Sequence, residues 1–305
     1  MSLAKRLFDN FDQIVIYGAK GWFGRSAVSA VMQENPVILE NQILLIGSKS
    51  ESGQSADLPW NVYSSADALK LIRSNSLFLN SAYLRREKLN LMSEKEYEAK
   101  NQEILEFGIS LIKAGKVKTF LNLSSGVASQ GSMKALDKVK DSYARGKIRD
   151  EALLISLCES TKTELVNCRI YSMSGKFINE FENLALSSFI NQASDKAKEI
   201  IVKSPSTKRT YVDSIDLARV LLEMACKGGS VFLDSGGTLT TFGEIATGLA
   251  SLIPGVNAIL PSEFEKSPDY YGDYERFNQL ASECGVKLLD LDQQIMETRK
   301  AFIKD

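Results

Sequence analysis

A glycine-rich turn between an apolar strand and a helix limits what this chain can fold into more than any other feature. Residues 13–24 read QIVIYGAKGWFG, and the helical pattern RSAVSAVMQEN follows directly. Three glycines at three-residue intervals permit a tight turn, a close approach of the backbone to a pyrophosphate, and close packing of the helix on the strand. The turn therefore predicts a dinucleotide-binding βαβ unit. Its candidate cofactor-binding residues are Gly18, Lys20, Gly21, Trp22, Phe23 and Gly24.

Apolar runs of strand length alternate with helical patterns along the first part of the chain. Strand-like runs follow the turn at residues 42–50, 76–83, 117–125 and 165–172, and helical patterns cover about residues 95–114 and 143–158. This alternation predicts an α/β fold with a doubly wound parallel sheet of the Rossmann type. We predict a Rossmann domain at residues 1–175, rejoined by a segment at about 205–235, and a smaller C-terminal substrate lobe formed mostly by residues 176–305. We expect a ligand cleft at the carboxyl ends of the strands.

Composition excludes several classes of function. The chain has 305 residues, a formal net charge of −1 and no histidine. Hydrolase triads that depend on histidine and the usual zinc sites are therefore excluded, and we predict no metal centre. A chain without a surplus of basic residues has little to offer a phosphate backbone, so nucleic acid is not an expected partner. Neither a signal peptide nor an apolar run of about 18 residues is evident, so we expect a cytoplasmic protein without a membrane segment.

The stretch SYARGKIRDE, residues 142–151, carries a candidate acid/base pair. Tyr143 and Lys147 are four residues apart and share one face of a helix. A lysine charge about 4 Å from a phenol is worth about 4 kcal/mol at an effective dielectric of about 20, enough to bring the pKa of a tyrosine from near 10 towards neutrality. The alternative is an ordinary solvated helix face, because this spacing arises by chance about once in a chain of this composition.

Two serines lie where the predicted strand 117–125 ends. A hydroxyl at Ser125 can hydrogen-bond a substrate oxygen while Tyr143 exchanges a proton with the same atom. We therefore take Ser125, Tyr143 and Lys147 as the candidate catalytic group. Ser124 beside them is a candidate substrate contact.

The end of the second strand bears on the choice of cofactor. It reads Gly47-Ser48-Lys49 and has no carboxylate to accept the ribose hydroxyls of NAD. Lys20 and Lys49 can instead pair with a ribose 2′-phosphate, for which Ser48 is a suitable donor. The sequence thus favours NADP over NAD. The alternative is that both lysines are solvated surface residues.

Taken in order, these motifs resemble the extended short-chain dehydrogenase/reductase family, which includes NAD-dependent epimerases and dehydratases of nucleotide sugars. The glycine turn, the Ser124-Ser125 pair, and Tyr143-x-x-x-Lys147 followed by Glu151 match successive landmarks of that family. Asn101 matches the asparagine of its central helix. The segments CRIYSMSG and RTYVDSIDLARVL, at residues 168–175 and 209–221, resemble its later motifs, so the match covers nearly the whole chain.

This resemblance implies roles for the matching residues. Tyr143 would be the acid/base, Lys147 would hold the nicotinamide ribose, and Ser125 would orient the substrate. It further implies a homodimer packed through the helix that carries Tyr143. The remaining positions implied for cofactor binding are Asn80, Ser81, Ala82 and Tyr171, and those implied for the diphosphate of a nucleotide sugar are Asn183 and Arg209.

The chain departs from the family pattern at several positions. Gly126 and Val127 stand where sugar dehydratases typically have an Asp-Glu pair, so dehydration is disfavoured. Gly146 replaces the common small hydroxyl residue before the lysine, at a cost of about 1 kcal/mol in helix propensity. We expect an NAD(P)-dependent oxidoreductase or epimerase of a nucleotide-linked sugar. The alternatives are a carbonyl reductase of another substrate and a dinucleotide-binding regulatory protein without turnover.

Overall fold

The computed structural model describes residues 2–33, 42–52, 58–179, 184–194 and 198–302. Two compact units divide the chain. The first comprises residues 1–169 and 218–233, and the second comprises residues 170–217 and 234–305. No helix in the described ranges has the length and apolar character needed to cross a membrane.

The first unit is built on a seven-stranded sheet in the order β10-β6-β5-β4-β1-β2-β3. Parallel pairing joins β1 to β2 and β4, β2 to β3, and β4 to β5. The strands are β1 Gln13–Tyr17, β2 Ile43–Gly47, β3 Val62–Ser64, β4 Ser76–Asn80, β5 Val117–Ser125, β6 Glu164–Ile170 and β10 Val231–Asp234. Every residue of β1, β2 and β4 is buried, which explains their uninterrupted apolar sequences. The predicted doubly wound α/β fold is confirmed.

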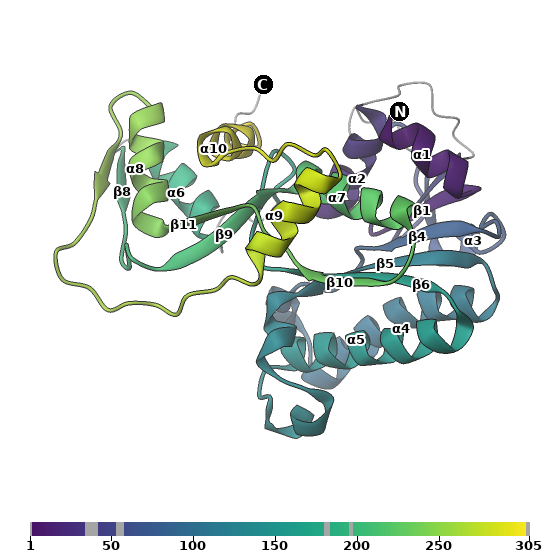
Figure 1. Ribbon diagram of the computed structural model, residues 1–305. Coiled ribbons are helices and arrows are strands. Elements are labelled where there is room, and N and C mark those ends of the chain that lie inside the picture. Colours follow the sequence, from purple (N-terminus) through teal and green to yellow (C-terminus); the bar gives the residue numbers. More distant parts are fainter. Residues whose placement is uncertain (1, 34–41, 53–57, 180–183, 195–197, 303–305) are drawn as a thin grey trace. The chain divides into compact units, whose positions relative to one another are not determined.

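Helices cover both faces of this sheet, with α4 and α5 on one face and α1, α2 and α7 on the other (Figure 1). The helices of the unit are α1 Leu3–Asn10, α2 Trp22–Met32, α3 Ser65–Ala68, α4 Glu94–Lys113, α5 Ser142–Thr161 and α7 Ser214–Lys227, with short 3₁₀ turns at Arg86–Leu91, Gly126–Gln130 and Met133–Lys138. Side-chain caps set the start of the two long helices. Ser93 accepts a hydrogen bond from the Glu96 N–H before α4, and Asp141 accepts one from the Tyr143 N–H before α5.

Three predicted strands run past the observed ends, and the run 165–172 is one of them because β6 ends at Ile170. The run 42–50 leaves the sheet after Gly47, and the run 76–83 leaves it after Asn80. In the second case the chain turns towards α4, where the Leu84 N–H donates to the Asn101 side chain at 2.7 Å. Residues 48–50 are exposed once β2 has ended, whereas residues 81–84 stay partly buried beside α4.

The second unit combines two small sheets with helices. One sheet has the order β11-β9-β7, and the other pairs β12 with β8. Its elements are β7 Met173–Ser174, α6 Ala185–Ser194, β8 Glu199–Ile201, β9 Lys208–Asp213, β11 Thr238–Thr241, α8 Phe242–Leu252, β12 Asn257–Ile259, α9 Tyr274–Glu283 and α10 Leu291–Arg299. Helices α6, α8 and α10 share a core that includes Phe189, Ile245 and Ile295. The unit thus has a hydrophobic core of its own.

Candidate active site

The glycine turn adopts a geometry that side chains would prevent. Gly18 has a φ of +87°, and a Cβ built on it would lie 2.7 Å from the Ala82 nitrogen. Its N–H donates to the Ile46 carbonyl at 2.9 Å, which ties the turn to β2. A Cβ at Gly24 would collide with the Gly18 carbonyl. The turn after β1 and the packing of α2 on it therefore both require glycine.

A cavity of about 480 Å³ opens beside this turn. Five of the predicted cofactor-binding residues line it: Gly18, Gly21, Ser48, Ser81 and Ala82. Helix α2 begins directly after Gly21 without a side-chain cap, which leaves backbone donors at its start for an anion. A cradle next to a glycine turn and an uncapped helix start fits a dinucleotide. The predicted residues Trp22 and Phe23 do not line this cavity, and their side chains are buried in the core.

A carboxylate that the sequence analysis missed stands between the two predicted phosphate-binding lysines. Glu51, four residues after the end of β2, forms salt bridges with both Lys20 and Lys49, the latter at 3.1 Å. Hydrogen bonds from these two lysines hold the pKa of Glu51 below its ordinary value. The pattern contained a signal for it, since Glu51 lies only two residues beyond Lys49. The two positive charges are thus partly neutralised within the protein.

Lys147 is a buried cation on α5. Its side chain donates to the Leu123 carbonyl at 3.0 Å. This hydrogen bond connects α5 to the end of β5, two residues before Ser125. Burial lowers the pKa of Lys147 to about 8, against the opposing charges of Asp150 and Glu151. The Lys147 Nζ is 6.0 Å from the ring centroid of Tyr143, which is partly buried on the same helix. Ser125 closes β5 and is 8% exposed.

Buried amides form a chain of hydrogen bonds across three neighbouring strands. Asn80 on β4 donates to Asn122 on β5 at 3.2 Å, and Asn122 donates to Asn167 on β6 at 2.8 Å. Asn167 in turn donates to Glu151 on α5 at 3.2 Å. The predicted cofactor residue Asn80 thus has a structural partner, and the sequence carries no signal for the other two amides. This chain fixes α5 to the sheet beneath it.

Glu151 terminates that chain in an ion pair. Its two carboxylate oxygens accept hydrogen bonds from Arg169, and the Oε2–Nη2 distance is 2.7 Å. Burial would raise the pKa of Glu151, but the hydrogen bonds and charge of Arg169, together with contributions from Ser124 and Asn167, outweigh it and hold the pKa below its ordinary value. Ser124, the predicted substrate contact, is 4% exposed.

The remaining predicted residues belong to the second unit. The Arg209 guanidinium lies over the rings of Phe242 and Tyr270, at 5.1 and 5.7 Å, and its Nη1 donates to two backbone carbonyls. It forms no salt bridge within the described part of the chain. The Tyr171 ring packs against Tyr270 at 4.8 Å. Asn183 lies outside the described residues.

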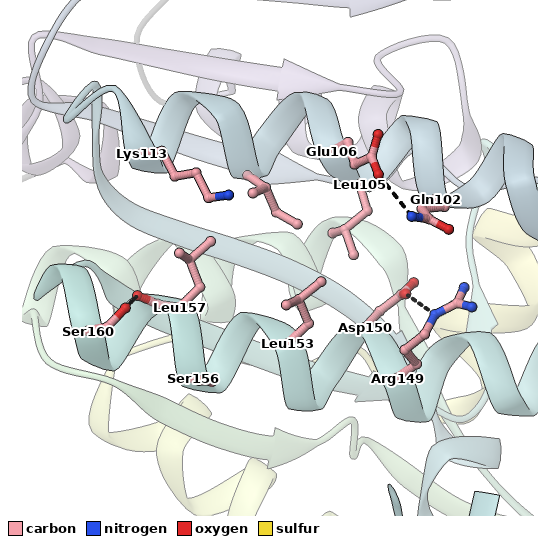
Figure 2. A pocket seen from close by; sticks show the side chains of 11 residues that line it. Gln102, Leu105, Glu106, Lys113, Arg149, Asp150, Leu153, Ser156, Leu157 and Ser160 are labelled. Atoms are coloured by element: carbon pink, nitrogen blue, oxygen red, sulfur yellow. Dashed lines mark hydrogen bonds and ion pairs between the residues drawn. The ribbon is translucent and has the colours of Figure 1, made fainter.

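A second hollow, of about 420 Å³, lies between α4 and α5 (Figure 2). Its apolar lining comes from Leu105 and Ile109 on α4 and from Leu153 and Leu157 on α5. Leu153 is 45% exposed. Polar groups edge the hollow, including a Gln102–Glu106 hydrogen bond of 2.9 Å and an Arg149–Asp150 ion pair of 3.8 Å. This surface of α4 and α5 is termed the α4–α5 face below.

The model of the NAD dependent epimerase/dehydratase family matches residues 14–231 of the chain. No curated protein matches the sequence. Several solved structures share its fold at low sequence identity. The UDP-N-acetylglucosamine 4-epimerase from Methanobrevibacter ruminantium M1, in complex with UDP-N-acetylmuramic acid, is 17% identical, with a TM-score of 0.71 over 96% of this chain and 98% of that one.

Two further solved structures contain both a UDP-sugar and NAD. MoeE5 in complex with UDP-glucose and NAD is 15% identical, with a TM-score of 0.67 over 95% of this chain and 100% of that one. The UDP-glucuronic acid 4-epimerase from Bacillus cereus, in complex with UDP-glucuronic acid and NAD, is 12% identical, with a TM-score of 0.68 over 95% and 98%. At these identities the likeness establishes the fold.

Proposed function

Because the chain belongs to the NAD dependent epimerase/dehydratase family and is thereby an enzyme of the extended short-chain dehydrogenase/reductase type, we propose that it epimerises or reduces a nucleotide-linked sugar by hydride transfer. The observation that carries this proposal is the Lys147 ammonium, which is buried on α5 beside Tyr143 and hydrogen-bonded to the end of β5. A buried cation is costly without a function or a partner, and the Tyr143 ring centroid lies 6.0 Å from this one.

The proposed roles follow from the chemistry of the three side chains. Tyr143 takes the proton of a sugar hydroxyl, or returns it, at the oxygen of the reacting carbon. The positive charge of Lys147 stabilises the phenolate form of Tyr143. Ser125 donates a hydrogen bond to the same substrate oxygen. A bound dinucleotide supplies the hydride acceptor and donor. An epimerase returns the hydride to the opposite face of the sugar, whereas a reductase releases the product.

We take NAD as the cofactor. The sequence favoured NADP on the strength of Lys20 and Lys49, but Glu51 pairs with both lysines and reduces their combined charge. A ribose 2′-phosphate would have to compete with this carboxylate, whereas the ribose hydroxyls of NAD can donate to it. The family is described as NAD dependent, and MoeE5 binds NAD beside UDP-glucose.

For the substrate, we propose a nucleoside diphosphate sugar. Similar structures hold UDP-glucose, UDP-glucuronic acid and UDP-N-acetylmuramic acid. Arg209 supports the same class, because its guanidinium has no carboxylate partner in the described residues and can pair with a diphosphate. Asn183 remains a predicted contact.

We also propose a homodimer that packs through the α4–α5 face. Four apolar side chains surround a hollow there, and the exposed Leu153 projects from α5 towards α4 in Figure 2. A second copy of the chain would remove this apolar surface from water.

Turnover of a panel of UDP-sugars with NAD tests the function directly. We expect Tyr143→Phe to lower kcat by about 10²- to 10⁴-fold, because general acid–base catalysis contributes about that factor. Tyr271→Phe is the matched control, since Tyr271 is an exposed tyrosine of the second unit. Full activity of the Tyr143→Phe enzyme would refute the mechanism.

Arg209→Ala distinguishes a nucleotide sugar from a small carbonyl compound as the substrate. A carbonyl reductase of a small molecule would not depend on that residue.

A further inference from the structure

The Lys147 ammonium faces a tyrosine other than Tyr143. Its Nζ lies 3.6 Å from the ring centroid of Tyr83, much closer than the 6.0 Å to the ring of Tyr143. The two aromatic rings meet edge to face, with centroids 5.6 Å apart and planes at 85°. Tyr83 therefore presents its negative π face to the cation and also contacts the ring of Tyr143.

The backbone on both sides of Tyr83 is fixed by hydrogen bonds. The Ser81 hydroxyl donates to a carbonyl of β1 at 2.8 Å. After Tyr83, the Leu84 N–H donates to Asn101 at 2.7 Å, and the Leu84 carbonyl accepts from the Tyr97 hydroxyl at 2.7 Å. Asn101 and Tyr97 both belong to α4 and are buried. The backbone that carries Tyr83 is thus held in place by groups outside the Lys147 site.

Gly146 explains how this ring fits beside α5. A methyl group at position 146 would collide with the Tyr83 hydroxyl oxygen, while the ring carbon that bears the oxygen is 3.8 Å away. Glycine inside a helix costs about 1 kcal/mol relative to alanine, so its presence in the middle of α5 needs a reason. The Tyr83 hydroxyl oxygen alone accounts for glycine at position 146, because the Tyr83 ring would leave room for a methyl group.

We propose that Tyr83 is a positioning residue for Lys147 of the active site, and that Gly146 is the residue that admits it. The inference rests on the proposed function, in which Lys147 acts on Tyr143. Burial opposes the positive charge on Lys147, and an aromatic face in a dry environment favours it. Tyr83 and the Leu123 carbonyl therefore keep the ammonium charged and directed, and the hydroxyl-bearing residue usual at position 146 in the family is excluded by the Tyr83 phenol.

The first test measures thermal unfolding of the full-length protein without ligands. Gly146→Ala should lower the unfolding midpoint in the wild-type background, because the methyl group meets the phenol oxygen. In the Tyr83→Phe background the same substitution should raise the midpoint by about 2 °C, since only the helix-propensity gain remains. A shift of the same sign and size in both backgrounds would overturn the role assigned to Gly146.

The second test follows the Lys147 amine by NMR in protein with ¹³Cε-labelled lysine, with the signal assigned by its loss in Lys147→Met. Tyr83→Leu should lower the Lys147 pKa by about one pH unit, because the cation loses an aromatic face. Tyr83→Phe should leave it unchanged, because the face is kept. Equal titration of the Leu variant and the wild type would overturn the positioning role.

Neither measurement needs cofactor or substrate, so the two proposals can fail separately. If Lys147 titrates as expected in the Tyr83→Leu and Tyr83→Phe variants and no UDP-sugar is turned over with NAD, the proposed function fails and the positioning role stands. If turnover depends on Tyr143 and the Leu variant titrates like the wild type, the function stands and the role of Tyr83 fails.

Discussion

Two nitrogens of Arg169, Nε and Nη2, donate hydrogen bonds to the Glu151 carboxylate, and the shortest of these bonds, from Nη2 to Oε2, is 2.7 Å. Glu151 is 6% exposed and sits at the third position of the Tyr143, Lys147, Glu151 series, one turn beyond the lysine. The same carboxylate accepts the last hydrogen bond of the amide chain that crosses β4, β5 and β6. Glu151 therefore joins the helix that carries the candidate catalytic residues to the sheet.

Replacing Glu151 by glutamine should destabilise the protein. The loss of one partner of a largely buried ion pair is expected to lower the free energy of unfolding by about 2 kcal/mol at pH 7. Because the folded-state pKa of Glu151 is lowered, its contribution is present above the ordinary pKa of 4.5 and is lost as the pH falls through the folded value. The difference between wild type and Glu151→Gln, measured by urea unfolding, should therefore shrink in acid. Glu159→Gln, an exposed site on the same helix, should show no such difference.

Replacing Glu51 by glutamine should shift the cofactor preference towards NADP. The change removes the carboxylate that pairs with Lys20 and Lys49 and leaves both lysines to meet a 2′-phosphate. We expect the ratio of kcat/KM for NADP to that for NAD to rise about tenfold. Lys49→Ala in the same background should reverse part of the gain. An unchanged ratio would show that the phosphate does not reach these residues.

Replacing Gly18 by alanine should weaken NAD binding. The residue has a φ of +87°, and the new methyl group would press on the Ala82 backbone at the wall of the cavity. Gly115→Ala is a matched control, because Gly115 also has a positive φ of +67° but a methyl group there meets no described atom within 4 Å. Both variants should lose about 1–2 kcal/mol of stability from backbone strain. Isothermal titration with NAD should show weakened binding for Gly18→Ala alone.

Replacing Asp150 by asparagine should move the alkaline limit of activity. The negative charge of Asp150 favours the protonated form of Lys147, whose pKa is about 8. Without that charge the Lys147 pKa falls, so the decline of kcat/KM at high pH should begin at lower pH than in the wild type. The Glu159→Gln enzyme should follow the wild-type profile. Superimposable pH profiles of the wild type and Asp150→Asn would show that Lys147 does not set the decline of kcat/KM at high pH.

Introducing a charge on the α4–α5 face should break the proposed dimer. We expect the wild type to sediment at twice the chain mass of 33.7 kDa and Leu153→Glu to sediment as a monomer. Leu69→Glu provides the control, since Leu69 is 52% exposed at the end of α3. A wild-type protein that sediments as a monomer at micromolar concentration would exclude this assembly.

Local sequence was sufficient for the alternation of elements and for the glycine turn. The predicted strand 117–125 matches β5, and the predicted helix 95–114 differs from α4 by one residue at each end. Burial on both faces makes parallel strands read as unbroken apolar runs, and a start capped by Ser93 makes a helix readable from its N-terminus. Family membership followed from the order of short motifs along the chain, and the family match over residues 14–231 confirms it.

Tertiary structure alone decided which charges and rings meet. Glu51 pairs with two lysines, Tyr83 covers Lys147, and three asparagines from separate strands connect to Glu151. Apart from the Lys49–Glu51 pair, these contacts depend on strand order and on register, which bring together residues far apart in the sequence. Periodicity reports only whether a residue is buried, because it is set by neighbours along the chain. The partner of a buried polar group is set across the sheet, and the sequence carries no local trace of it.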